Sequence, residues 1–234
     1  MTIVQQPVLS AYEAVTLNTY RDIHKGIRAE LFAVTTAAGS VDPADRAGRA
    51  DLARHVGSVV DLLVSHAHHE DAVVQPALEV YLPDLAAVVA LDHPRLEARI
   101  EAISELAANA VEAPSFAQRD DVHRLYMELA SFTSSYLAHQ DFEERDIMPA
   151  LDRAIGFDGV LALLLANVGS LTPQEMATSL PLMIPAMNID DRTELLGGMQ
   201  QGAPAEVFAQ VWGLVRSVLD PCDAEALAKR LGID

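Results

Sequence analysis

Histidine and glutamate recur at the same spacing in two parts of this 234-residue chain. His66 is followed four residues later by Glu70, and His139 is followed four residues later by Glu143. Residues four apart share one face of a helix, so each pair directs an imidazole and a carboxylate toward the same point. Imidazole and carboxylate groups without thiolates suit iron, manganese or zinc. The spacing therefore predicts a metal site built on helices.

The two pairs belong to a longer pattern that occurs twice. Each pair is followed by proline, alanine, leucine and an acidic residue, at 76–79 and 149–152, and each is preceded by a lone histidine in an apolar helical stripe. Two similar helical hairpins facing each other would bring these side chains to one centre. The predicted metal ligands are His24, His66, Glu70, His93, His139 and Glu143.

Four histidines with two glutamates predict two ions. Carboxylates that bridge a pair of ions are typical of helical-bundle di-iron proteins. Iron is favoured because helical bundles with this ligand set are redox sites more often than structural zinc sites. A helical bundle has its own apolar core, so it does not need a structural metal. Ions that prefer about five or six ligands each are not saturated by this set, so open positions are expected for water, hydroxide or a small external ligand.

Four long amphipathic helices must position these residues. Apolar residues recur in steps of three and four over about 11–38, 44–81, 85–111 and 116–147, and one of the four histidines interrupts each stripe. An unpaired buried carboxylate would cost several kcal/mol. No lysine or arginine lies in these stripes, so a cation from solution is the expected compensation. The pattern predicts an all-α protein, an antiparallel up-down four-helix bundle.

Composition narrows the class of protein further. The net charge of −18 argues against nucleic acid and anionic membranes as partners, because both require a basic surface. The single cysteine, Cys222, excludes an internal disulfide and a thiolate zinc site. Residues 1–10 lack the regions of a signal peptide and are expected to form a leader. The longest apolar run, 159–166, is too short to cross a bilayer. A cytoplasmic protein is expected.

The character of the sequence changes after Gly156. Residues 157–234 contain five prolines, four methionines and no histidine. This C-terminal all-helical extension is expected to form short helices at 157–168, 172–180, 190–201, 204–219 and 223–231. The predicted domains are 1–155, the bundle, and 156–234, an accessory helical subdomain. The accessory subdomain is expected to pack on the bundle or to form the contact of a homodimer, with its methionines in an apolar core.

The ligand pattern resembles the hemerythrin-like (HHE cation-binding) family over about residues 12–155. The resemblance rests on the two proline tags and on the order His24, His66-x3-Glu70, His93, His139-x3-Glu143. It implies an antiparallel four-helix bundle with a non-haem di-iron centre that binds O₂ or a related small molecule. By this resemblance the four histidines are terminal iron ligands, and Glu70 and Glu143 are bridges.

Two positions depart from the pattern of oxygen-carrying hemerythrins. Those proteins have a second histidine on the third helix, where this chain has Glu97, and they place the fourth-helix carboxylate one position later, which would select Glu144. The apolar stripe and the internal repeat favour Glu143 instead. Glu97 lies beside its stripe, and its binding of metal is left open. Reversible O₂ carriage is therefore less securely implied than di-iron binding.

Other polar residues are given simpler interpretations. Tyr20 and Tyr136 lie one turn before His24 and His139 and are expected to be core residues, with hydrogen bonding to a bound oxygen species or iron ligation as the alternative. Asp71 is expected at the surface. Asp22 and Arg28 flank His24 and are expected on a solvated helix face, with contacts that support the site from outside its ligands as the alternative. The remaining histidines are expected to be solvated or locally hydrogen-bonded: His55, His68, His69 and His123.

Three functions are compatible with such a site. The first is binding of O₂ or a related diatomic or peroxide ligand at an open di-iron centre. The second is an enzyme that removes peroxide or nitric oxide, or protects iron centres from them. The third is an iron- or O₂-responsive regulator in which the C-terminal helices transmit the signal.

Overall fold

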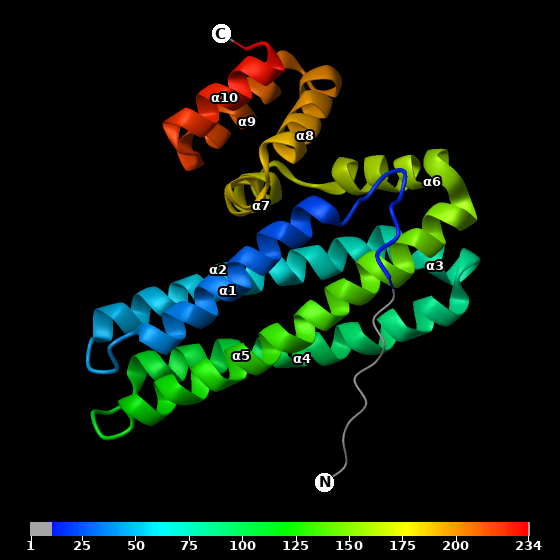
Figure 1. Ribbon diagram of the computed structural model, residues 1–234. Helices are drawn as coiled ribbons and strands as arrows, with labels where there is room; N and C mark the ends of the chain where they lie inside the picture. The colour runs from blue at the N-terminus through cyan, green and yellow to red at the C-terminus, as the bar shows by residue number, and fades with distance from the viewer. Residues whose placement is uncertain (1–10, 234) are drawn as a thin grey trace.

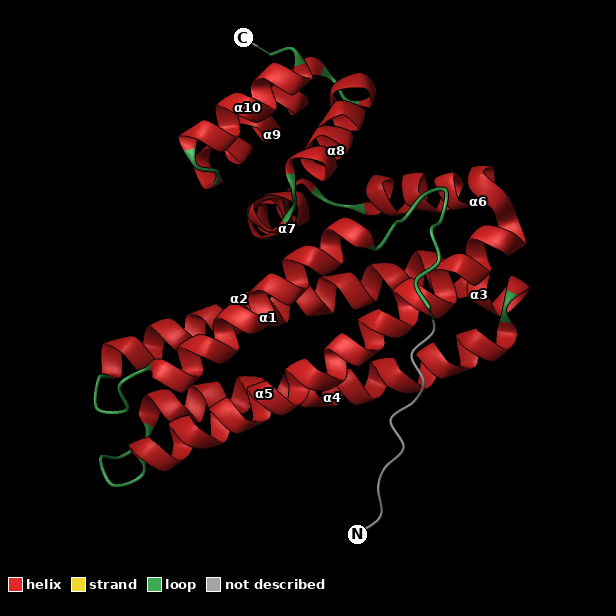
Figure 2. Ribbon diagram, viewed as in Figure 1, coloured by secondary structure: helices red, strands yellow, loops and turns green. Residues whose placement is uncertain are grey.

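The computed structural model describes residues 11–233, and within this range every regular element is a helix (Figures 1 and 2). The predicted all-α fold is confirmed. The leader expected at residues 1–10 lies outside the described residues. In the part of the chain described, no single helix has the length and hydropathy of a membrane span. One bent pair of helical stretches, Gln118–Ser170 and Pro173–Ala186, has that length and hydropathy only when the two are taken together.

Four long helices lie side by side and form the body of the molecule (Figure 1). They are α1 (Arg21–Ser40), α2 (Arg46–His69), α4 (Pro83–Glu112) and α5 (Gln118–Phe142). Turns at the ends of the bundle join them, so successive helices run in opposite directions. Both α1 and α4 pack against α2 and α5, which places the predicted stripes around a common core. Leu31, Leu63, Leu125 and Phe132 are among its fully buried side chains.

Two π-helical turns interrupt the bundle at equivalent places. They are η1 (Glu70–Val74), which leads into α3 (Gln75–Tyr81), and η2 (Glu143–Ile147), which leads into α6 (Met148–Ser170). Pro76 and Pro149 lie two residues after the last residue of each turn, and a proline lacks the N–H that an α-helical turn requires. The preceding N–H groups instead bond five residues back, from Gln75 to Glu70 and from Met148 to Glu143. The repeated prolines therefore account for the wider turns.

The first helix begins later than the sequence pattern predicts. Helix α1 starts at Arg21, whereas its stripe extends back to about residue 11. The Asn18 side chain accepts hydrogen bonds from the N–H groups of Tyr20 and Arg21 and so ends the non-helical segment. Thr16 bonds the Asp152 carboxylate of α6. Residues 11–20 are thus held along α6 rather than continuing α1.

The chain turns away from the bundle at Gly156, inside α6. This residue has φ 66° and ψ 178°, a conformation that is essentially restricted to glycine. Four helices follow: α7 (Pro173–Ala186), α8 (Ile189–Gly202), α9 (Ala205–Val218) and α10 (Pro221–Leu231). They enclose a second core, which contains the four methionines of the tail. Helix α7 lies against α1, where a Cβ on Gly26 would be 3.0 Å from the Met183 backbone.

Candidate metal centre

The six predicted ligands converge at the end of the bundle nearest α6 and α7. Two groups of four have ligand atoms within 4.8 Å of one another, and both groups contain Glu70 and Glu143. The first group adds His24 and His66, and the second adds His93 and His139. All six side chains are buried, His24 completely. Each group therefore joins both hairpins.

Glu70 presents one carboxylate oxygen to each group. Its Oε1 lies 3.1 Å from Nε2 of His66, in the same hairpin, and its Oε2 lies 3.6 Å from Nε2 of His93, in the other. Neither oxygen has a hydrogen-bond partner among the described residues. The carboxylate is thus placed between two imidazoles without being satisfied by either.

Glu143 repeats this arrangement from the opposite hairpin. Its Oε2 lies 3.4 Å from Nε2 of His24, and its Oε1 lies 3.2 Å from Nε2 of His139. The Nε2 atoms of His24 and His66 are also 3.2 Å apart. Ligand atoms roughly 2.1 Å from one ion and at right angles lie about 3 Å from each other. These spacings fit two ions, each surrounded by one group.

Unsatisfied buried atoms support the same fit. Besides both oxygens of Glu70, Oε2 of Glu143 and Nε2 of His93 are buried without a hydrogen-bond partner in the described chain. Each such group costs about 1–3 kcal/mol, and a charged one costs more. A cation at each group would compensate these atoms together, so the residues present fit a metal pair.

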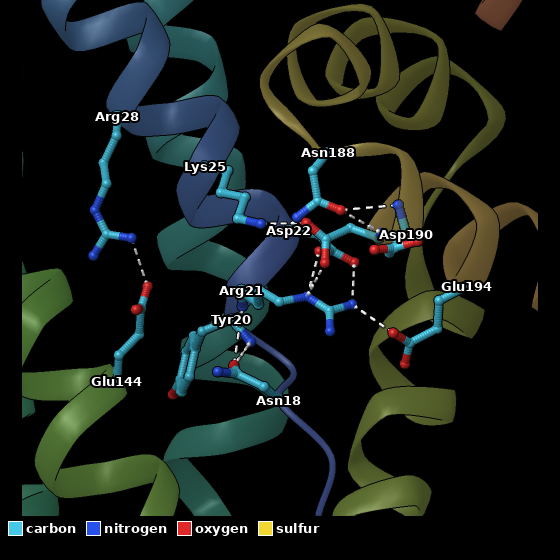
Figure 3. A network of polar contacts seen from close by, with 11 residues as sticks. Asn18, Tyr20, Arg21, Asp22, Lys25, Arg28, Glu144, Asn188, Asp190 and Glu194 are labelled. Atoms are coloured by element: carbon cyan, nitrogen blue, oxygen red, sulfur yellow. Dashed lines mark hydrogen bonds and ion pairs between the residues drawn. The ribbon is translucent and has the colours of Figure 1, made fainter. Parts of the chain in front are cut away.

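Two further carboxylates fix the orientation of two imidazoles. Glu144 accepts a hydrogen bond of 2.8 Å from Nδ1 of His24, and Asp71 accepts one of 2.7 Å from Nδ1 of His93. Because carboxylates accept only, each imidazole carries its proton on Nδ1 and turns the lone pair of Nε2 toward the centre. Arg28 donates to the same Glu144 oxygen at 2.7 Å (Figure 3).

Asp71 and Glu144 occupy equivalent positions in the repeat, each one residue after a central glutamate. Each bonds the lone histidine of the other hairpin. Asp71 lies at the surface, as expected, with 49% of its side chain exposed, and it also makes this specific contact with His93. Arg28 agrees with the alternative interpretation, because its side chain, 29% exposed, forms an ion pair with Glu144 beside His24. A second acidic residue after each glutamate was the sequence signal for both contacts.

The charges of the cluster interact strongly. Burial, followed by the charge of Glu143, raises the pKa of Glu70 well above its usual value. Burial, followed by the electrostatic interaction with His24, lowers the pKa of His66 to about 3. For Glu143 burial acts in the opposite sense, but the hydrogen bond and charge of His139 outweigh it and lower the pKa. A cation beside Glu70 would favour the charged form of its carboxylate and so oppose this rise of the pKa.

Both tyrosines of the stripes are core residues at the edge of the cluster. Tyr20 stacks on His24 with ring centroids 5.0 Å apart, and Tyr136 lies edge-on to His139 at 5.8 Å. Burial, and then the charges of the two central glutamates, raise the pKa of both phenols well above the usual value. Both hydroxyls therefore keep their protons at neutral pH.

The other histidines follow the sequence interpretation with one exception. His68 and His123 are exposed, and His55 pairs with Glu30 at 2.9 Å. His69 is buried and bonds Ser170 at 3.0 Å and Glu175 at 3.1 Å, which join it to the C-terminal helices. Its partners are about a hundred residues away in sequence, so no local pattern indicated them.

The alternative ligands lie outside both groups. Glu97 is exposed and borders a cavity beside His93 and His139. Glu144 faces Nδ1 of His24, on the side of the imidazole turned away from the cluster. The arrangement accordingly places Glu143, and not Glu144, at the centre, as the stripe and the repeat predict.

A helical bundle that surrounds two overlapping groups of buried histidines and glutamates defines a cation-binding helical domain. Comparison with known protein families matches residues 15–154 to the Hemerythrin HHE cation binding domain. The match covers more than half of the chain, so the chain belongs to the hemerythrin HHE cation-binding family, as the resemblance predicts. Comparisons with curated proteins and with solved structures give no match.

Proposed function

We propose that this protein holds two iron ions between its hairpins and binds O₂, or a related small molecule such as peroxide or nitric oxide, at their open positions. The observation that carries the proposal is the placement of Glu70 and Glu143, each with one oxygen toward either histidine pair. Carboxylates in this position support a bridged pair of ions.

One set of residues would hold the ions, and a second set orients the imidazoles of the first. His24 and His66 would hold one ion, His93 and His139 the other, and the two glutamates both. Bound iron supplies the redox chemistry and the open coordination positions. Asp71 and Glu144 hold two of the imidazoles in the orientation that binding requires. The buried phenols of Tyr20 and Tyr136 lie at the edge of the cluster and pack against His24 and His139.

Reversibility separates a carrier from an enzyme. The iron-loaded protein is reduced without oxygen, exposed to air and returned to vacuum while its optical spectrum is recorded. A carrier restores the oxygen-free spectrum over repeated cycles. An enzyme oxidises irreversibly, and O₂ release from added peroxide then measures its activity. A reduced iron-loaded protein whose spectrum responds to none of O₂, peroxide and nitric oxide would contradict the proposal.

Regulation by iron or O₂ is the second candidate, favoured by contacts that join the site to the C-terminal helices. Lys25, next to His24, forms an ion pair with Asp191 of α8, and Arg21 lies 3.3 Å from the same carboxylate. His69, next to Glu70, bonds Glu175 of α7. If these contacts transmit occupancy, protease sensitivity of residues 157–234 should differ with and without iron. Identical digestion would exclude this role.

A further inference from the structure

The internal repeat allows the two sides of the cluster to be compared position by position. Residues after His66 in α2 correspond to those after His139 in α5, and residues after His93 in α4 correspond to those after His24 in α1. One side of the cluster lies where α2 meets α4, and the other lies where α1 meets α5. Differences between equivalent positions therefore show how the two ions differ in access.

A cavity lies between α2 and α4. Its buried residues include His93, His139 and Tyr136, of which the two histidines are only 4% and 5% exposed. Its lining also includes Val64, which is 49% exposed, and Glu97, which is exposed. The cavity thus extends from the surface to the histidine pair of the second group, where Nε2 of His93 has no hydrogen-bond partner.

Small size at one position keeps this space open. Ala67, which follows His66, lines the cavity, and the equivalent residue after His139 is Gln140. Gln140 is completely buried. Glu97, four residues after His93, corresponds to Arg28, four residues after His24. Arg28 forms an ion pair with Glu144 beside His24 (Figure 3). Larger and paired side chains therefore occupy the α1–α5 side where the α2–α4 side has alanine and an exposed carboxylate.

We propose that the external ligand binds at the ion held by His93 and His139, that it arrives through the cavity between α2 and α4, and that Ala67 keeps this route open. The inference rests on the proposed di-iron function and assigns its ligand position. The lining is mainly aliphatic and aromatic, and Glu97 adds negative charge at the exposed end. Such a passage favours a neutral diatomic molecule over an anion.

Nitric oxide tests the route, because it is neutral and its binding to the reduced protein is followed optically. Association rates are measured by stopped flow on the full-length, iron-loaded protein and on Ala67→Gln, which copies the residue of the other side. We expect the rate to fall about tenfold or more, since entry then requires displacement of the added side chain. Gln140→Ala, the matched change on the other side, should bind at the wild-type rate.

Each outcome decides the inference. A wild-type rate in Ala67→Gln with full iron content, or equal slowing in Gln140→Ala, overturns it and leaves the di-iron function intact. If the wild type itself takes up no iron, the proposed function fails as well. Should Ala67→Gln lose iron, Ala67→Val is measured in the same way, and a wild-type rate in that variant overturns the proposed route.

Charge at the exposed end gives an independent readout. The oxidised protein is mixed with azide, an anion, and the rate is compared between the wild type and Glu97→Gln. Removing the carboxylate should speed azide binding severalfold and leave the nitric oxide rate of the reduced protein unchanged. Equal azide rates in the two proteins would contradict entry past Glu97.

Discussion

At the scale of single residues, Asp71 and Glu144 cross-link the two hairpins through the imidazoles that they orient. Each follows a central glutamate and bonds the lone histidine of the opposite hairpin. The metal site and the pairing of the hairpins therefore depend on the same contacts. Substitution of either carboxylate should lower the affinity for metal more than it lowers the stability of the fold.

Glu144→Ala tests this dependence. Loss of the partner of Nδ1 lets His24 rotate and change tautomer, so we expect the affinity for iron to fall about 10- to 100-fold. Competition with a chelator of known affinity measures the change. Glu30→Ala removes a similar carboxylate–histidine pair, that of His55, away from the cluster. Wild-type affinity in Glu144→Ala, or an equal loss in Glu30→Ala, would show that the contact does not position the ligand.

The six central residues could be predicted because they interrupt apolar stripes, and a buried polar residue needs a partner. Asp71 could not be predicted in the same way, since it lies outside the stripe and is half-exposed. Its contact exists because the π-helical turn at Glu70 changes the direction of the following side chains. The proline at 76 is visible in the sequence, but its effect on the turn requires the structure.

At the scale of elements, Gly156 determines how the chain leaves the bundle. A side chain at φ 66° and ψ 178° is strained, so we expect Gly156→Ala to lower the free energy of unfolding by about 1–3 kcal/mol. Gly169→Ala is the matched control in the same helix, where an added Cβ meets open space. Urea unfolding of both variants measures the difference. A wild-type midpoint for Gly156→Ala would mean that the turn relaxes without cost.

The start of α7 contributes stability that depends on pH. Hydrogen bonds from Thr172, and then one from His69, lower the pKa of Glu175 to about 2. Because this value lies below the unfolded value of about 4.3, the contribution is present above that pH and is lost as the pH falls through the folded value. In the metal-free full chain, wild type should therefore melt above Glu175→Gln at neutral pH.

Thermal unfolding between about pH 7 and pH 2 measures this difference, which should shrink as the pH falls. Glu206→Gln, at the start of α9, controls for the loss of a surface charge. A difference that grows toward acid pH would contradict the assignment of Glu175 as the responsible group.

The helices of the C-terminal extension could be predicted within a few residues, because prolines and caps mark their boundaries; the exceptions are the start of α6 and the end of α7. Their position on α1 could not, since it depends on Gly26 and on the ion pair of Lys25 with Asp191, which join distant parts of the sequence. The segment 11–20 was predicted wrongly for a similar reason. Its apolar spacing is helical, but Thr16 and Leu17 are held against other elements.

At the scale of the whole molecule, the main apolar core of the bundle lies on one side of the buried polar cluster, and a smaller apolar cluster that includes Leu78, Val89 and Ile147 lies on the other. The core should keep the chain folded without metal, while bound iron adds stability. Removal of iron by a chelator should lower the melting temperature, because binding at 100 times the dissociation constant contributes about 2.7 kcal/mol. His66→Ala should lose iron and melt like the chelated wild type. Near-wild-type iron content and melting in this variant would contradict the assignment.

Anomalous diffraction at the iron edge from crystals of the iron-loaded protein tests the central claim most directly. We expect two iron peaks roughly 3.5–4 Å apart, both in contact with Glu70 and Glu143, one with His24 and His66 and the other with His93 and His139. A single peak, no peak in the cluster, or two peaks that share neither glutamate would contradict it.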